Sequence, residues 1–299
     1  MENKPYFGLF ISIISVSFAA IFIKTINYFS PNIHPLAISF YRLFFTVLLV
    51  IPFFLLEKDN ILELKKLSKN DLILIFFIGI ILALHFSFWV TSLRYTSVAS
   101  SVILVTSHPI IVGPISYFLL KEKLSLINSI GILFSVIGVI GLVYGNSNLY
   151  PSSTSTIVGN IFALLGGVAF GLYIVGARKV RKKISLFPYV LIIYSVATIT
   201  LLIICVLQDI SVDDIDSTSL FLIVLMAFIS GILGHTLYNW SIGYIRASLA
   251  SVALLGEPII SSFLALLIPW IAEVPTIYTV IGGSFVLFGI YLTSKKPSK

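Results

Sequence analysis

The chain has 299 residues, of which 58% are hydrophobic and only 10% are charged, and its mean hydropathy is +1.09. Soluble domains carry roughly 45–50% apolar and about 25% charged residues, so this composition excludes a water-soluble globular protein. The net charge of +7 is divided among short segments between apolar blocks, an arrangement that argues against a nucleic-acid-binding patch.

The apolar residues form ten blocks of about 20 residues, the length needed to cross a hydrocarbon core of about 30 Å as a helix. Short polar connections separate the blocks. We therefore predict an all-α membrane protein with ten transmembrane helices. The predicted spans are 7–27, 35–56, 71–93, 97–119, 126–145, 157–177, 187–207, 219–242, 247–269 and 275–293.

Little of the chain is left outside these spans. The first span is too long for the apolar region of a signal peptide, so we expect it to stay in the mature chain. The longest connections, 57–70 and 146–156, have room for a surface helix or a loop but not for a catalytic module. The single cysteine, Cys205, lies in the seventh span and is expected to be a small buried side chain.

The basic residues indicate an orientation. With the N-terminus in the cytoplasm, all but three of the 19 basic residues fall in cytoplasmic segments, and the exceptions are Lys24, Arg42 and Arg94. Four aspartates gather in the opposite connection, 208–218. Because basic residues favour the cytoplasmic side, both termini are predicted there, in a multi-pass protein of the cell (cytoplasmic) membrane. The basic loops are candidates for contact with membrane lipid, and no nucleic acid is expected as a partner.

An internal repeat is visible in the sequence. LVTSHPIIVG (104–113) returns as ALLGEPIISS (253–262), and the match extends to Glu122 with Glu273. We predict a first repeat over 1–149 and a second over 150–299. Each half holds five spans, so the second crosses the membrane inverted, a recurrent plan of secondary transporters. The aligned glycines, expected to allow close helix packing, are Gly131 with Gly282 and Gly138 with Gly289.

The chain resembles the drug/metabolite transporter superfamily, specifically its EamA-type ten-helix exporters. The resemblance covers essentially the whole chain, and it is carried by LRYTSVASSVILVTSHPIIVGPISYFLLKEKLSLINSIGILFSVIGVIG (93–141), by the weaker copy over 242–292, and by SFYRLFF (39–45). It implies a basket-like 5+5 inverted repeat, a central cavity and export of small metabolites by alternating access. It does not imply one substrate. Lys121 stands where that family often has a glycine, which leaves the conformation of that turn open.

Two helix faces combine aromatic and hydrogen-bonding residues at spacings that place each set on one face of a helix. Such faces are typical of a cavity for an amphipathic or aromatic solute, since rings provide stacking area and polar groups fix orientation. Hydrogen bonding between helices is the alternative. The candidate residues are His85, Trp89 and Ser92 in the third span and His235, Tyr238 and Asn239 in the eighth.

His108 and Glu257 occupy equivalent positions in the two repeats, with Ser101 and Ser261 on their respective helix faces. A histidine and a carboxylate at the centre of the membrane are candidates for proton coupling as well as for substrate binding. A fixed structural pair and a site for a substrate amine are the alternatives.

Two further cations lie within spans, Lys24 and Arg42. They are candidates for a gate or for contact with a substrate carboxylate; the alternative is a long side chain that reaches the membrane surface. Pro109, Pro114 and Pro258 are predicted to kink their helices, because proline cannot donate to the preceding turn.

No HExxH, CxxC, GxSxG or phosphate-binding glycine loop is present, so neither an enzyme, nor a cofactor, nor a metal site is expected. The predicted function is a secondary transporter that exports amino acids or related small amphipathic metabolites. A sugar-phosphate or nucleotide-sugar carrier, which would require several cations in the cavity, and a membrane receptor that does not move its ligand are the alternatives. The expected partners are a small-molecule substrate and membrane lipid, with a homodimer as the candidate assembly.

Overall fold

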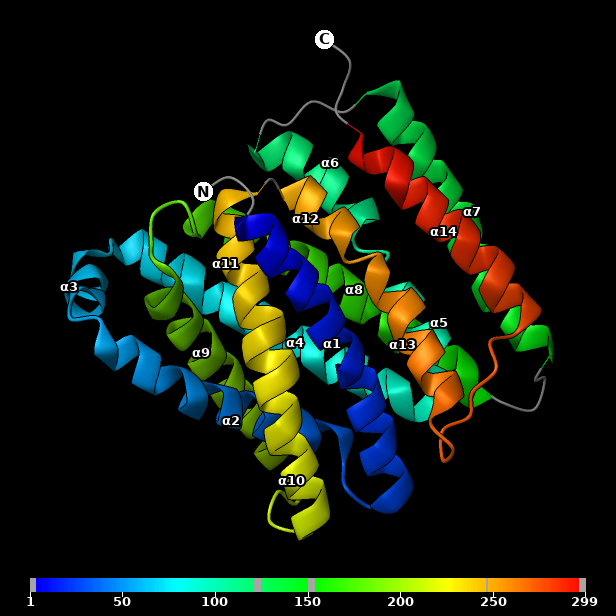
Figure 1. Cartoon of the computed structure of the whole chain (residues 1–299), viewed down its shortest axis with the longest axis horizontal. Coiled ribbons are helices and arrows are strands. Elements are labelled where there is room, and N and C mark those ends of the chain that lie inside the picture. The colour runs from blue at the N-terminus through cyan, green and yellow to red at the C-terminus, as the bar shows by residue number, and fades with distance from the viewer. Residues whose placement is uncertain (1–3, 121–124, 150–153, 246, 296–299) are drawn as a thin grey trace.

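The computed structural model describes residues 4–120, 125–149, 154–245 and 247–295, and the elements in these ranges are all helices. Lys121 and Glu122 lie outside them. The helices are α1 (Lys4–Phe29), α2 (Pro35–Leu56), α3 (Asp59–Lys66), α4 (Lys69–Tyr95), α5 (Val98–Val105), α6 (Pro109–Leu120), α7 (Leu126–Leu149), α8 (Thr154–Val180), α9 (Leu186–Leu207), α10 (Ser217–Met226), η1 (Ala227–Thr236), α11 (Leu237–Tyr244), α12 (Ala247–Ala253), α13 (Gly256–Leu267) and α14 (Ile277–Ser294) (Figure 1).

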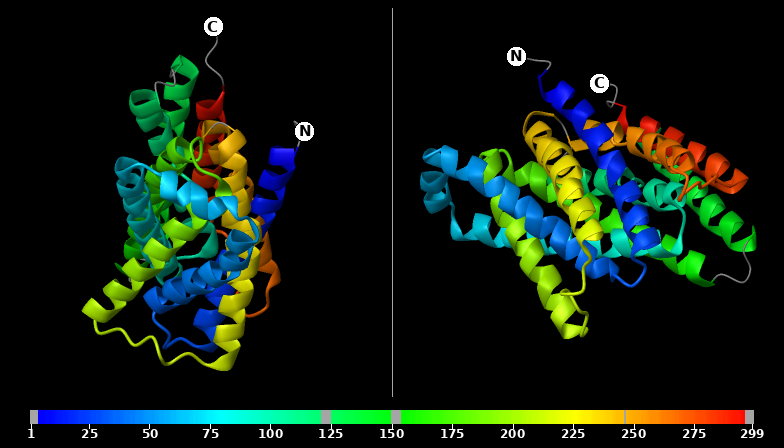
Figure 2. Two further views of the ribbon diagram at one scale, coloured as in Figure 1. Left: turned by 90° about the vertical axis from the view of Figure 1, so that its left-hand side faces the viewer. Right: turned by 60° about the horizontal axis from the view of Figure 1, so that its bottom comes forward.

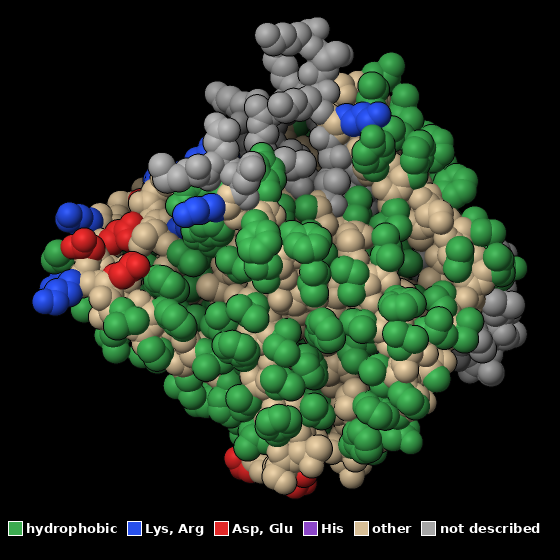
Figure 3. Space-filling model, viewed as in Figure 1, with side chains coloured by type: hydrophobic (Ala, Val, Ile, Leu, Met, Phe, Trp, Pro, Cys, Tyr) green, Lys and Arg blue, Asp and Glu red, His purple; other side chains and the backbone are tan. Residues whose placement is uncertain are grey.

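Seven segments of the described chain are long and apolar enough to cross a membrane, and they coincide with seven of the predicted spans. The predicted spans 126–145, 247–269 and 275–293 contain shorter apolar helices. Hydrophobic side chains cover most of the face in Figure 3, whereas charged side chains lie near its edges. This surface suits contact with lipid, and the protein is an all-helical, multi-pass membrane protein.

Several helices begin at a polar side chain that accepts a hydrogen bond from the first turn. Ser68 accepts one from the backbone N–H of Asp71, and Ser97 accepts one from Ser100. Asp216 and Thr276 cap α10 and α14 in the same way. These caps satisfy backbone donors that the helix itself leaves free, and they fix where the helices start.

Two predicted spans are interrupted, and this corrects the sequence-based expectation of continuous, kinked helices. The span 97–119 is divided into α5 and α6, and Pro109 is the first residue of α6. The hydroxyls of Thr106 and Ser107 donate to backbone carbonyls of the preceding turn, at 2.7 and 2.6 Å. Because these bonds compete with helix continuation, and proline fits a first helical position, the chain breaks where a kink was expected.

The equivalent span of the second half, 247–269, is divided in the same place. There α12 ends at Ala253 and α13 begins at Gly256, so that Pro258 is the third residue of α13. Pro114, by contrast, lies inside the unbroken helix α6. Each half of the chain thus carries one discontinuous helix, next to His108-Pro109 in the first half and next to Glu257-Pro258 in the second.

The eighth predicted span also departs from a simple α-helix, because its middle, η1, is wound as a π-helix over ten residues. The hydroxyl of Thr236 donates to the carbonyl of Gly231, five residues earlier, at 3.0 Å. Helix η1 packs against α1 and α2. Single π turns are uncommon and are frequently found at functional sites. A π segment of this length therefore indicates that the eighth span contributes to the functional site.

The helices surround a centre formed by α1, α4 and α8. Figure 1 shows α1 in front of α4 and α8, with α10, η1 and α11 on one side of it and α13 on the other. Helices α7 and α14 lie side by side at one edge, where a Cβ added at Gly138 would lie 2.6 Å from the carbonyl oxygen of Gly282. The predicted role of these glycines in close helix packing is confirmed.

The two ends of the molecule differ in charge. In Figures 1 and 2, the first turn of α1, the last turn of α14 and the turn between α8 and α9 lie at one end. The connection between α9 and α10, with its aspartates, lies at the other. At the first end, the connection 57–70 contains a surface helix, α3, which is one of the two possibilities that the sequence allows. Glu63 of this helix accepts a hydrogen bond from the backbone N–H of Ser185 at 2.7 Å. Cys205 is fully buried, as expected.

Candidate functional site

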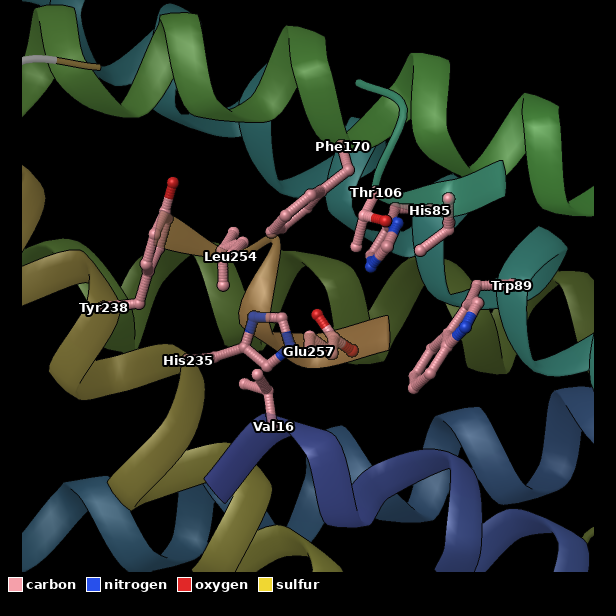
Figure 4. A pocket seen from close by; sticks show the side chains of 10 residues that line it. Val16, His85, Trp89, Thr106, Phe170, His235, Tyr238, Leu254 and Glu257 are labelled. Atoms are coloured by element: carbon pink, nitrogen blue, oxygen red, sulfur yellow. The ribbon is translucent and has the colours of Figure 1, made fainter. Parts of the chain in front are cut away.

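A small cavity lies where the two discontinuous helices approach the centre. Its volume is about 20 Å³, room for about one water molecule, so the helices are closed around it. Thr106 and Leu254, from the two helix breaks, both contribute to its wall. The lining residues, most of them labelled in Figure 4, are Val16, His85, Trp89, Val105, Thr106, Phe170, His235, Tyr238, Leu254 and Glu257.

The cavity wall is aromatic. The His85 ring lies nearly parallel to that of Trp89, at 6.0 Å and 3°, and 4.5 Å from that of Phe170. Nδ1 of His85 lies 3.0 Å from the carbonyl oxygen of Gly166. A carbonyl only accepts hydrogen bonds, so Nδ1 is the donor and the ring orientation is fixed.

Phe170 of α8 is the hub of this aromatic cluster. Its ring centroid lies 5.0 Å from that of His108, 5.9 Å from that of His235 and 6.3 Å from that of Tyr238. Helix α8 packs closely against the first helix break because it has a glycine, Gly167, at the contact. A Cβ at Gly167 would lie only 2.8 Å from the carbonyl oxygen of Val105. Phe170 is not among the candidate residues that the sequence indicates, because a phenylalanine does not stand out in an apolar helix.

Arg42 of α2 is 1% exposed. Its side chain therefore does not reach the membrane surface, which was one of the alternatives for this residue. Its guanidinium carbon lies 4.5 Å from the ring centroid of Phe86 and 5.4 Å from that of Trp89, close enough for cation–π attraction. Both terminal nitrogens, Nη1 and Nη2, are buried and have no hydrogen-bond partner in the described chain. Arg42 is thus a buried cation with unused donors beside the aromatic wall.

Glu257 is the acidic counterpart. It lies in the first turn of α13, where the helix dipole favours a negative charge, and its side chain lies beside the cavity in Figure 4. Among the described residues, its carboxylate makes neither an ion pair nor a hydrogen bond. Arg42 and Glu257 are therefore opposite charges near one cavity with no salt bridge between them.

His108 and Glu257 are not joined by an ion pair in the described chain. His108 instead directs Nδ1 to the hydroxyl of Ser251 in α12, at 3.4 Å, while its Nε2 is buried without a partner. The first helix break thus contacts the discontinuous helix of the second half through Ser251.

The remaining predicted site residues are buried but do not line the cavity. Ser92 and Ser101 are within hydrogen-bonding distance of each other, at 2.6 Å, which joins α4 to α5. The hydroxyl of Ser261 donates to the carbonyl of Glu257 at 2.7 Å. Asn239 accepts a hydrogen bond from the hydroxyl of Tyr173 at 2.6 Å, which ties α11 to α8.

Lys24 lies away from the central cavity, toward the end that carries the α9–α10 connection. Its Nζ forms an ion pair with Glu273 at 2.7 Å and donates to the carbonyl of Thr96 at 3.0 Å. Helix α1 is thereby tied to the α4–α5 corner and to the connection between α13 and α14. This position fits a gate better than a contact inside the cavity.

Within the described residues, no group of three or more histidine, cysteine, aspartate or glutamate side chains could hold a metal ion. Several buried hydrogen-bond donors around the cavity lack a partner in the described chain. They are Trp89 Nε1 and the Tyr238 hydroxyl, on two residues that line the cavity, and the two terminal nitrogens of Arg42, whose guanidinium stacks on Trp89. These donors match, in chemistry, groups that accept hydrogen bonds.

Several proteins with similar sequences are named as transporters or solute carriers. An uncharacterized transporter of Clostridium kluyveri is 26% identical over 248 residues, covering 81% of this chain and 79% of its own. The uncharacterized transporter YyaM of Bacillus subtilis is 25% identical over 90% of this chain and 86% of its own. Solute carrier family 35 member G1 of Mus musculus is 25% identical over 61% of this chain and 50% of its own.

One known crystal structure aligns with 98% of both chains at a TM-score of 0.65 and 16% identity, which shows a shared fold. The model of the EamA-like transporter family matches this sequence twice, over residues 4–144 and 157–295. Together these two matches span nearly the entire sequence, including both discontinuous helices and every residue of the cavity wall. The chain belongs to the EamA-like transporter family.

Proposed function

We propose that the protein is a secondary transporter that exports amino acids, or related small amphipathic metabolites, across the cytoplasmic membrane. The observation that supports this proposal is the placement of a buried cation, Arg42, and a buried carboxylate, Glu257, beside one aromatic cavity with no ion pair between them. A zwitterion offers each of them a partner of opposite charge.

The energetics of burial favour a solute with this chemistry. A buried donor without a partner costs roughly 1–3 kcal/mol, and more when it is charged. A solute carboxylate would remove that cost at Arg42, and a solute ammonium group would neutralise Glu257. Trp89 and Phe170 supply the flat apolar surface on which a ring or an aliphatic side chain packs.

Transport requires that the closed cavity open to one side at a time. With a volume of about 20 Å³, the cavity is too small for an amino acid, so the helices must separate to admit one. The two helix breaks, at 106–108 and 254–255, are the natural hinges, because irregular backbone absorbs changes in dihedral angle. Discontinuous helices at the substrate site are recurrent in transporters with inverted repeats.

The proposed topology has ten transmembrane helices in two inverted halves, with both termini in the cytoplasm. It is supported by the charge difference between the two ends of the molecule and by the two matches to the family model. Labelling with a membrane-impermeant thiol reagent tests it: in a Cys205→Ser background, Asp213→Cys is expected to react from outside intact cells and Lys182→Cys only after lysis. The reverse pattern would contradict the orientation.

The alternative carriers and receptors make different demands. A sugar-phosphate or nucleotide-sugar carrier needs several cations for its phosphates, whereas Arg42 is the cation of the described chain that stacks on the cavity wall. A receptor would bind its ligand without accumulating it.

Counterflow of tritiated amino acids in proteoliposomes distinguishes these functions. Vesicles are loaded with unlabelled L-phenylalanine, L-leucine or L-threonine, and uptake of the labelled compound is followed with and without an imposed pH gradient. Transient accumulation of at least one amino acid is expected. Binding without accumulation would favour the receptor, and neither binding nor accumulation would contradict the proposed substrate class.

A further inference from the structure

A second pocket lies beyond the central cavity, at the end of the molecule where α1 finishes. It has a volume of about 280 Å³, much larger than that of the central cavity. We call it the vestibule. Its lining residues are Lys24, Asn27, Tyr28, Pro31, Leu93, Arg94, Trp270, Ile271 and Glu273.

Helices α1 and α4 line both the vestibule and the central cavity. On α1, Val16 lines the cavity and Lys24 the vestibule; on α4, Trp89 lines the cavity and Leu93 the vestibule. At 1.5 Å per residue, these separations correspond to about 12 Å along α1 and about 6 Å along α4. A solute that leaves the cavity along these helices would enter the vestibule next.

A closed gate stands beside this path. Lys24 and Glu273 form their ion pair at 2.7 Å, and their side chains are only 19% and 23% exposed. The other carboxylate oxygen of Glu273 accepts a hydrogen bond from the backbone N–H of Val98 at 2.5 Å, and Lys24 donates to Thr96 at 3.0 Å. These bonds hold three separate parts of the chain together: α1, the α4–α5 corner and the α13–α14 connection.

The rest of the vestibule wall is anchored. Arg94 donates to the carbonyls of Pro31 and Ile33, and the indole N–H of Trp270 donates to the hydroxyl of Thr25 at 3.1 Å. Asn27 is the exception. Both its amide nitrogen and its amide oxygen are shielded from solvent and have no partner in the described chain, although the residue lines the pocket. Such a group is costly unless something binds it.

We infer that the vestibule is a second solute site, for the same carboxylate-bearing solute, through which the solute leaves the protein. This inference rests on the proposed function. The carboxylate of the solute competes with Glu273 for the ammonium group of Lys24. The Asn27 amide, which is shielded in the closed state, holds the solute once Lys24 is released from Glu273. Occupancy of the vestibule therefore weakens the tie between α1 and the α13–α14 connection, so that arrival of the solute favours opening of the gate.

Substitution of Asn27 and substitution of Glu273 are expected to have opposite effects on the KM for the solute. Asn27→Leu, which keeps the size but removes the hydrogen bonds, is expected to raise the KM measured from the vestibule side by about threefold to tenfold, the range for one or two hydrogen bonds. Glu273→Gln is expected to lower that KM, because it weakens the competitor for Lys24. The KM from the opposite side is expected to change by less than about twofold, because the central cavity is untouched.

The experiment compares right-side-out and inside-out membrane vesicles that contain wild-type protein or a variant, with tritiated L-phenylalanine, L-leucine and L-threonine as probes. Asp213→Asn, a loop substitution outside the vestibule lining at the same end, is the matched control, and size-exclusion profiles verify folding. Equal changes on both sides, or no change with either variant while the wild type transports, would overturn the second site alone. Absence of transport by the wild type would contradict the proposed function, and the second site with it.

Discussion

The guanidinium of Arg42 combines two properties that a lysine cannot reproduce. It stacks on Phe86 and Trp89, and it presents two free nitrogens that match a carboxylate. We predict that Arg42→Met lowers the affinity for a transported amino acid by roughly tenfold to a hundredfold, since hydrogen bonds to charged groups contribute about 1.5–3 kcal/mol. Arg42→Lys is expected to recover only part of this loss. Scintillation proximity binding in detergent measures both variants.

The esterified form of the same amino acid is the control for this prediction, because it lacks the carboxylate. Its affinity is expected to respond much less to Arg42→Met than that of the free amino acid does. An equal loss for ester and free acid would show that Arg42 only supports the aromatic wall.

We propose that Glu257 is the residue that links solute binding to a proton. We predict that Glu257→Gln makes uptake insensitive to an imposed pH gradient, because the amide cannot titrate. Exchange of amino acid without a gradient is expected to persist with a raised KM, because the amide no longer neutralises the ammonium group of the solute. His108→Ala is expected to leave the gradient response in place, since His108 bonds to Ser251 and not to Glu257. Uptake into proteoliposomes with and without the gradient measures both. If His108→Ala alone removed the response, the histidine would be the coupling residue instead.

Some of the site residues could be predicted from the sequence, and others could not. His85, Trp89, His235, Tyr238 and Glu257 were identified because polar and aromatic side chains stand out in apolar helices, and all five line the cavity. Phe170 and Thr106 were not, since phenylalanine and threonine are common in membrane helices. Their importance comes from which helices meet, which no local pattern records.

The two discontinuous helices were also only partly predictable from the sequence. Pro109 and Pro258 predicted a disturbance at the correct residues, because proline lacks a backbone donor wherever it stands. The sequence did not show whether the helix would bend or stop. That outcome depends on the hydroxyls of Thr106 and Ser107 and on the glycines of α8 that pack against the break.

Close packing of α8 against the first break leads to a prediction. A Cβ at Gly167 would lie 2.8 Å from the carbonyl oxygen of Val105 and 3.0 Å from that of Leu104, and neither backbone atom can move without shifting α5. Gly167→Val is therefore expected to destabilise the protein by about 1–3 kcal/mol, the usual cost of overpacking. Gly141→Val is the matched control, because a Cβ there would have, among the described residues, no contact within 4 Å apart from its own stretch of helix. Fluorescence-detected thermal unfolding compares them, and equal melting temperatures would contradict the packing argument.

The central cavity is closed to anything larger than a water molecule, and the proposed alternating access requires that this closure be temporary. We predict that a cysteine at position 106, introduced by Thr106→Cys in a Cys205→Ser background, reacts slowly with a thiol reagent under resting conditions and faster during exchange of substrate. The reason is that the cavity of about 20 Å³ admits about one water molecule and no reagent until it opens. Mass spectrometry of labelled protein gives the rates. Rapid labelling from both sides at once would indicate a channel.

The buried hydrogen-bond donors that lack partners around the closed cavity affect the kinetics of the proposed transport cycle. Closing over Arg42, Trp89 and Tyr238 with nothing to accept their hydrogen bonds leaves an energetic cost that a bound solute removes. The unloaded carrier must therefore climb a higher barrier to reorient than the loaded carrier does. Exchange of solute for solute is therefore expected to be faster than net efflux into a solute-free medium. The same barrier would slow reorientation of the unloaded carrier.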